Sequence, residues 1–165
     1  MNRPPLRARL RAVIGFLAAI AFAVSPALVE GFNGFSADQF PVPQNDPPVQ
    51  PAGYAFAIWG VIYLWLILGA GYGLLRAAAD PQWHAMRLPL AISLILGAFW
   101  LAAANASPPL ATAMIVVMAG TAIMAMLRAG DDAPWAQARP VALYAGWLTA
   151  ATGVGIGVLL GGYAV

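Results

Sequence analysis

The sequence contains no cysteine and no lysine, and it has a single histidine, His84. The absence of cysteine excludes disulfide bonds, thiolate chemistry and cysteine-based metal sites. Charged residues make up only 8% of the chain, whereas soluble domains carry about 25%. Because 62% of the residues are hydrophobic, the composition predicts a membrane protein. The net charge of +2 comes from arginines scattered between apolar runs, which indicates membrane topology and no nucleic-acid partner.

Five apolar runs are long enough to cross a bilayer, since a helical span needs about 20 residues. The chain is therefore predicted to be all-α: a polytopic membrane protein whose single domain, residues 1–165, is a five-transmembrane-helix bundle embedded in the lipid bilayer. Pro89 and Pro140 are expected to open the third and fifth spans, because proline is tolerated in the first turn of a helix. The predicted spans cover residues 12–30, 54–76, 89–105, 109–127 and 140–162.

The first run has two interpretations. Basic residues precede it, and its second half contains small residues such as Ala21 and Ala23, as in a cleaved signal peptide. The run is, however, longer than the usual apolar core of about 7–15 residues. A first helix that is retained in the mature protein is therefore the favoured interpretation.

The only long polar connection covers residues 31–53 and is expected to face outward. It contains five prolines, which exclude a helix and favour an extended, semi-rigid loop. The loop is either a simple linker or a lid over one end of the bundle, since long loops in compact proteins are often binding loops. Its prolines are Pro41, Pro43, Pro47, Pro48 and Pro51.

The arginines predict an orientation in the cell membrane. With five spans, all of them fall on one side, while the long loop and the 105–109 turn have none. By the positive-inside rule, the N-terminus is then cytoplasmic and the C-terminus is outside. The arginines are Arg3, Arg7, Arg9, Arg11, Arg76, Arg87, Arg128 and Arg139.

Apart from Glu30 and Arg76 at their ends, the predicted spans contain no Asp, Glu, Lys, Arg or His. This argues against a pump, an ion-coupled transporter or a channel with a charged filter, which place such groups inside the membrane. The spans also lack a nucleophile paired with a base and a cluster of metal ligands, so no enzyme activity is expected. His84 and Trp83 are expected in a short cytoplasmic loop. With no second ligand nearby, His84 is interpreted as an interfacial residue instead of a haem-iron ligand.

Aromatic residues gather at the start of the second span. At about 100° per residue, Phe56, Trp59 and Tyr63 share one helix face. Tyr63 would lie near the middle of the helix, away from the membrane–water boundary where aromatic residues usually gather. An aromatic side chain at that depth packs against other helices or lines a cavity.

The same stretch, Pro-x-Gly-aromatic-x-Phe followed by Trp-x-x-x-Tyr, resembles the tryptophan-rich sensory proteins. These form the TspO/MBR family, which includes the mitochondrial translocator protein. The resemblance implies a five-helix architecture. It also implies a porphyrin or haem as ligand, with no required cofactor, and a sensory, regulatory or transport role. The matching residues are Pro51, Gly53, Tyr54, Phe56, Trp59 and Tyr63.

Two further segments extend the resemblance. Trp147 and Ala151, four residues apart, are similar to a pair that borders the family's ligand pocket, and Trp100 is similar to its third-helix tryptophan. The chain departs from the family at Gly97 and Gly155, where asparagine is common, so the expected pocket is more apolar. Taken alone, each aromatic residue is better explained by core packing, and the family match is what supports a pocket. The candidate ligand-binding residues are Phe56, Trp59, Tyr63, Trp100, Tyr144, Trp147 and Ala151.

Small residues recur every four positions along the fifth span, a spacing that lets another helix approach closely. This row predicts a packing surface, on which a homodimer could form, and supports an alternative function as a structural or assembly subunit without a ligand. The segment 153–157 also resembles part of a nucleotide-binding loop, but no strand precedes it, so that interpretation is excluded. The row consists of Ala145, Thr149, Gly153, Gly157 and Gly161.

Overall fold

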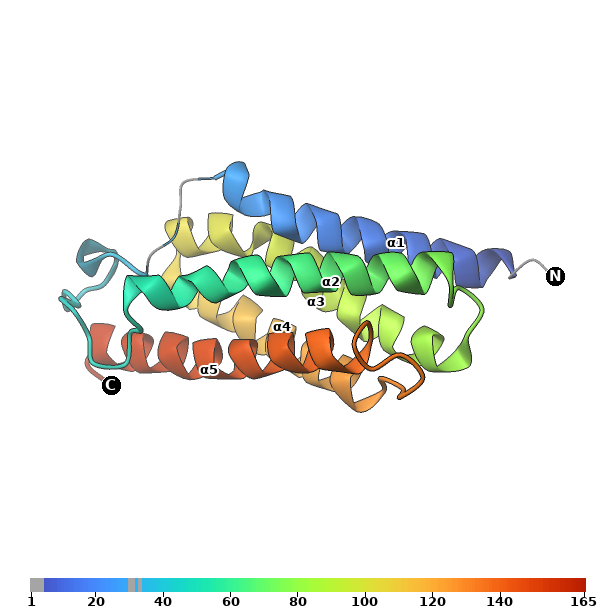
Figure 1. The fold of residues 1–165 in the computed structure, drawn as a ribbon. Coiled ribbons are helices and arrows are strands. Elements are labelled where there is room, and N and C mark those ends of the chain that lie inside the picture. Colours follow the sequence, from blue (N-terminus) through green and yellow to red (C-terminus); the bar gives the residue numbers. More distant parts are fainter. Residues whose placement is uncertain (1–4, 30–31, 33) are drawn as a thin grey trace.

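A computed structural model describes residues 5–29, 32 and 34–165. Within these residues the chain is helical and contains no strand. Five helices, each long and apolar enough to cross a membrane, form one bundle with the two termini at opposite ends (Figure 1). The predicted all-α, five-helix architecture is therefore confirmed. The helices are α1 (Leu6–Val24), α2 (Ile58–Leu75), α3 (Pro81–Ala106), α4 (Pro108–Leu127) and α5 (Ala138–Gly162).

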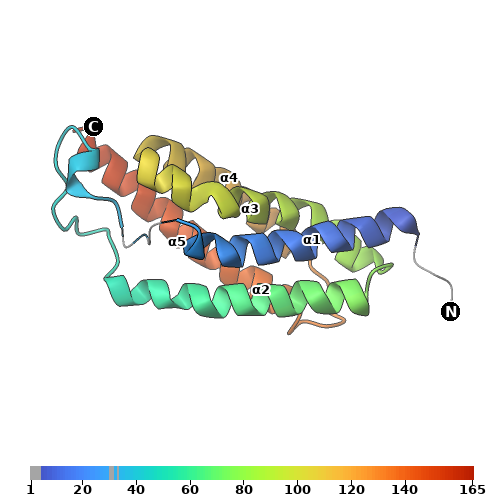
Figure 2. The ribbon, with the colours of Figure 1, turned by 90° about the horizontal axis from the view of Figure 1, so that it is seen from above.

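The helices are arranged as a ring. Helix α3 packs against α1 and α4, α4 packs against α5, and α1 packs against α2. Helices α2 and α5 complete the ring but share few contacts, and they diverge toward the end of the bundle that carries the C-terminus (Figure 2). Their close approach is at the other end, where Gly69 lies against the carbonyl oxygen of Ala136. A side chain at Gly69 would overlap that oxygen, so glycine permits the contact.

The third helix begins at Pro81, and the prediction that Pro89 opens it is wrong. Asp80 caps the helix by accepting hydrogen bonds from the backbone N–H groups of Gln82 and Trp83, and Pro81 occupies the first turn. Pro89 lies inside the helix. Asp followed by Pro is the stronger start signal, because the aspartate satisfies N–H groups that would otherwise lack partners.

This earlier start moves Trp83 and His84 out of the expected cytoplasmic loop and into the first turn of α3. Trp83 is only 2% exposed. Its ring covers Gly73 of α2 and tilts against Tyr72 at a centroid distance of 5.8 Å. Trp83 is thus a core residue that joins α2 to α3.

Arg87, also expected in the loop, is 5% exposed and caps the C-terminal end of α2. Its guanidinium donates hydrogen bonds to the carbonyl oxygens of Gly73, Ala77 and Ala78 at 2.8–2.9 Å. It also lies 6.0 Å from the ring centroid of Trp83. The Gly73 carbonyl belongs to the last turn of α2, whose carbonyls have no partner within the helix, while Ala77 and Ala78 belong to the turn that follows it.

No charged residue was expected inside the spans. Several helices, however, extend beyond the apolar runs and include arginines. The described arginines nevertheless stay at one end of the bundle, near the N-terminus of α1, the C-termini of α2 and α4, and the N-termini of α3 and α5, whereas Asp38 and Asp46 lie in the loop at the other end. Arg3 lies outside the described residues. The described arginines are Arg7, Arg9, Arg11, Arg76, Arg87, Arg128 and Arg139.

The small-residue row of α5 is not one continuous helix-packing surface, since Ala145 is buried in the core whereas Thr149 and Gly153 are exposed. Gly153 has no atom within 4 Å of the position where a Cβ would stand. Gly157 and Gly161 lie against Val49 and Gln44 of the proline-rich loop. The row therefore supports a loop near one end of α5 and is open at Gly153.

We expect Arg87→Ala to lower the free energy of unfolding by about 1.5–3 kcal/mol, because it leaves helix-end carbonyls unpaired in a buried site. Thermal unfolding in detergent would measure the change. Arg76→Ala, at an exposed arginine that ends the same helix, is the matched control and should have little effect. Equal melting temperatures for both variants would contradict the capping role.

Candidate functional site

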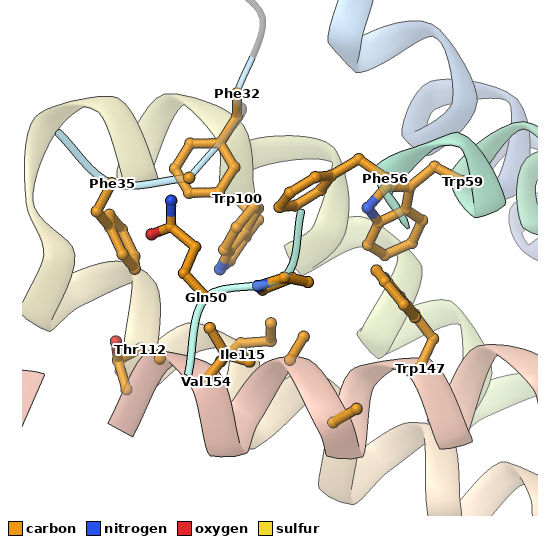
Figure 3. A pocket seen from close by; sticks show the side chains of 15 residues that line it. Phe32, Phe35, Gln50, Phe56, Trp59, Trp100, Thr112, Ile115, Trp147 and Val154 are labelled. Carbon is orange, nitrogen blue, oxygen red and sulfur yellow. The ribbon is translucent and has the colours of Figure 1, made fainter. Parts of the chain in front are cut away.

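A cavity of about 140 Å³ lies at the end of the bundle that carries the proline-rich loop (Figure 3). A second cavity of about 230 Å³ adjoins it, and the two share Phe32, Phe56, Trp59, Trp100 and Ile115 as lining residues. The wall of the first cavity comes from the loop and from α2, α3, α4 and α5. Its remaining lining residues are Gly34, Phe35, Gln50, Pro51, Thr112, Trp147, Ala150, Ala151, Val154 and Gly155.

Aromatic rings in fixed orientations form much of this wall. Trp59 stacks on Tyr63 at a centroid distance of 5.3 Å and meets Trp147 edge-on at 6.0 Å. Phe32 meets Trp100 edge-on at 5.1 Å, and the Trp100 indole donates a hydrogen bond to the carbonyl oxygen of Ala111 at 2.9 Å. Such stacked and edge-on pairs are favourable ring geometries. The cavity is therefore bounded by side chains that hold one another in place.

Local structure places these rings. Residues Gly53–Ala57 form a short 3₁₀ helix that runs directly into α2. Phe56 and Trp59 thus stand about one turn apart on the side that faces the cavity. On α5, Trp147 and Ala151 are also one turn apart and both line the cavity.

The proline-rich loop is docked on the bundle. The side chain of Gln39 donates hydrogen bonds to the carbonyl oxygens of Ala104 and Asn105 at 3.0 and 3.2 Å. The backbone N–H of Val42 donates to the carbonyl oxygen of Gly162 at 3.0 Å. Phe40 is buried against Gly162. These contacts favour the lid over the simple linker. Residues 31 and 33 of the predicted loop lie outside the described residues.

Most of the candidate ligand-binding residues border these cavities. Tyr63 lines the second cavity, while Tyr144 lines neither. Tyr144 is fully buried in the core, where its hydroxyl is 2.9 Å from the Ser93 hydroxyl, which donates to the carbonyl oxygen of Met118. The candidates that line the first cavity are Phe56, Trp59, Trp100, Trp147 and Ala151.

Sequence reasoning missed the contributions of the lid and of α4. The aromatic residues Phe32 and Phe35, in a loop that is otherwise polar and proline-rich, are a signal that could have identified the lid residues. Thr112 and Ile115 lie within an apolar run and carry no such signal. The two glycines that depart from the family pattern both line a cavity: Gly155 the first and Gly97 the second.

The site is nearly free of polar groups. None of the residues that line either cavity is charged. Among the described side chains, the Thr112 hydroxyl and the Trp147 indole N–H are buried without a hydrogen-bond partner. No group of three or more His, Cys, Asp or Glu side chains in the described residues is placed to hold a metal ion. His84 lies at the opposite end of the bundle, where its Nε2 is 2.6 Å from Nη1 of Arg11.

The helix number, the proline-rich loop and the aromatic cavity agree with a comparison against protein families. The model of the TSPO-like protein family matches residues 10–164. The chain belongs to the TSPO-like protein family. Searches of curated proteins and of solved structures found no match. In this TSPO-like protein, the cavity beneath the docked loop is the candidate functional site.

We expect Gln39→Ala to loosen the lid, because it removes both hydrogen bonds to the end of α3. Hydrogen–deuterium exchange should become faster in peptides from residues 36–50, since exchange reports local opening. Asn45→Ala is the matched control, because Asn45 is an exposed polar residue of the same loop. A lid held by these bonds is excluded if both variants exchange like wild type.

Proposed function

We propose that this TSPO-like protein binds a hydrophobic small molecule in the two adjoining cavities and acts in regulation or transport. The observation that carries the proposal is an aromatic, uncharged cavity closed by a docked loop. Ligand sites are typically concave and apolar, with a few polar groups. Because the lining residues include no nucleophile paired with a base, we infer binding without catalysis.

The size of the cavities bears on the ligand. A cavity of about 150 Å³ accommodates benzene, so the first cavity by itself suits a compact ring system. A porphyrin or haem, the ligand that the family resemblance implies, is larger. We propose that it would occupy both cavities at once, which requires the Phe32 ring between them to move. Its flat face would then rest on Trp59 and Trp147.

An alternative function, as a structural subunit without a ligand, draws on the open surface of α5. Gly146 and Gly153 are exposed, and no atom lies near the position of a Cβ at either. A partner helix could approach closely there. The ligand-binding experiment below separates the two functions, since a purely structural subunit would bind no porphyrin.

We expect Trp59→Ala and Trp147→Ala each to weaken protoporphyrin binding several-fold or more, since each aromatic contact contributes about 0.5–1.5 kcal/mol beyond its buried area. Tryptophan fluorescence titration would measure the affinity. Trp135→Ala is the control, because Trp135 is 47% exposed and lies in the loop before α5 at the opposite end of the bundle.

Removing a buried tryptophan can cost about 3–5 kcal/mol of stability. Each variant must therefore first show helical circular dichroism and a monodisperse elution peak. If the folded variants bind as tightly as wild type, the proposed pocket walls are wrong. If wild type binds no porphyrin, the structural alternative is favoured.

We also propose that the protein lies in the cell membrane with its N-terminus in the cytoplasm and the lid outside. The support is the gathering of arginines at one end of the bundle, which the positive-inside rule assigns to the cytoplasm. Reporter fusions should report an external position for residues 40–50 and a cytoplasmic one for residues 129–135. The reverse pattern, or a mature protein that begins after Ala23, would overturn this orientation.

A further inference from the structure

We propose that the ligand carries one uncharged polar group, a hydroxyl or a carbonyl, that forms a hydrogen bond with Thr112. The rest of the molecule would lie in the apolar part of the cavity. This inference rests on the proposed function and specifies the chemical class of its ligand: a compact, neutral, apolar alcohol or ketone.

Thr112 differs from every other threonine in the chain. Thr121, Thr149 and Thr152 each donate a hydrogen bond from the hydroxyl to the carbonyl oxygen one helical turn earlier, at 2.7–2.8 Å. Thr112 also lies in a helix, yet its hydroxyl has no partner although the side chain is only 5% exposed. A buried hydroxyl without a hydrogen bond is unfavourable. We therefore infer that the hydrogen-bond partner of the Thr112 hydroxyl is a molecule bound in the first cavity.

Gly155 lies against this hydroxyl, whose oxygen is almost inaccessible in this structure. A Cβ at position 155 would stand 3.2 Å from the Thr112 oxygen, so a side chain there would cover the hydroxyl. Figure 3 shows the Thr112 oxygen on the side toward Phe35 and the lid. The Gln50 amide lies farther away, between Phe32 and Phe35, and packs against Gly34. Thr112 is therefore the polar group of the wall that is available to a ligand.

The lining residues also determine that the polar group is neutral. A carboxylate or an ammonium group loses its hydration when it is buried, and this cost is offset only by an opposite charge and further hydrogen bonds. No lining residue of either cavity is charged. An ionised group, including the propionates of a bound porphyrin, would therefore have to stay outside the cavity in water, whereas a hydroxyl or carbonyl needs only the partners that are present.

Three probes that share one ring system test the inference: naphthalene, 2-naphthol and 2-naphthoate. Each is titrated by calorimetry into wild-type protein in lipid nanodiscs, with empty nanodiscs as the blank. We expect 2-naphthol to bind about 5–10-fold more tightly than naphthalene, the factor that one hydrogen bond typically contributes. Naphthoate should bind most weakly, because its charge has no partner.

Substitutions assign the effect to Thr112. Thr112→Val replaces the hydroxyl by a methyl group and should lower the affinity for 2-naphthol about 5–10-fold while leaving naphthalene within about twofold. Thr112→Ser keeps the hydroxyl and should restore the preference for 2-naphthol. Thr121→Val, at a threonine of the same helix that lines neither cavity, should bind all three probes like wild type.

Thermal unfolding without any probe gives an independent measurement. Thr112→Val should raise the melting temperature, because it removes an unpaired buried hydroxyl, whereas Thr121→Val should not. If naphthalene and 2-naphthol bind equally, or if Thr112→Val keeps the preference for 2-naphthol, the inference is wrong while the proposed function stands. If neither naphthalene, 2-naphthol nor protoporphyrin binds to wild type, the proposed function and the inference fail together.

Discussion

Unpaired carbonyl groups at the ends of helices constrain this structure more than any other feature. The last carbonyls of a helix have no partner within that helix, and where the helix end is covered by protein another part of the chain must supply the partner. Arg87 supplies it at the end of α2, the Gln39 side chain does so at the end of α3, and the backbone of Val42 does so at the end of α5. Two of these partners belong to the proline-rich loop. The position of the lid, and with it the closure of the cavity, therefore follows from the pairing of helix ends.

The sequence predicted the helices well because long apolar runs have few alternative structures in a bilayer. The period of the helix likewise identified Phe56, Trp59 and Tyr63 as a group, and all three line a cavity. The start of α3 was misplaced because an apolar run marks the membrane-embedded part of a helix and not its ends. The cap at Asp80 lies outside that run.

What sequence reasoning could not supply depends on which faces meet in three dimensions. Thr112 is one polar residue in an apolar helix, and nothing local distinguishes it from Thr121. Its hydroxyl lies against Gly155 of α5, which offers no side-chain partner. The contacts of the small-residue row on α5 could not be predicted either, since a row at helical spacing does not reveal whether a helix, a loop or lipid covers it.

The ring of helices is closed least firmly between α2 and α5, which meet around Gly69 and separate toward the lid. The first cavity lies along this join, with Phe56 and Trp59 on one side and Trp147 and Ala151 on the other. Because α2 and α5 share few contacts, they can separate more easily than other neighbouring helices of the ring. Under the proposed ligand-binding function, separation of α2 and α5 would admit a molecule larger than the empty volume of the cavities. Lipid that presses the helices together would oppose that separation, so the composition of the membrane would then influence which molecules bind.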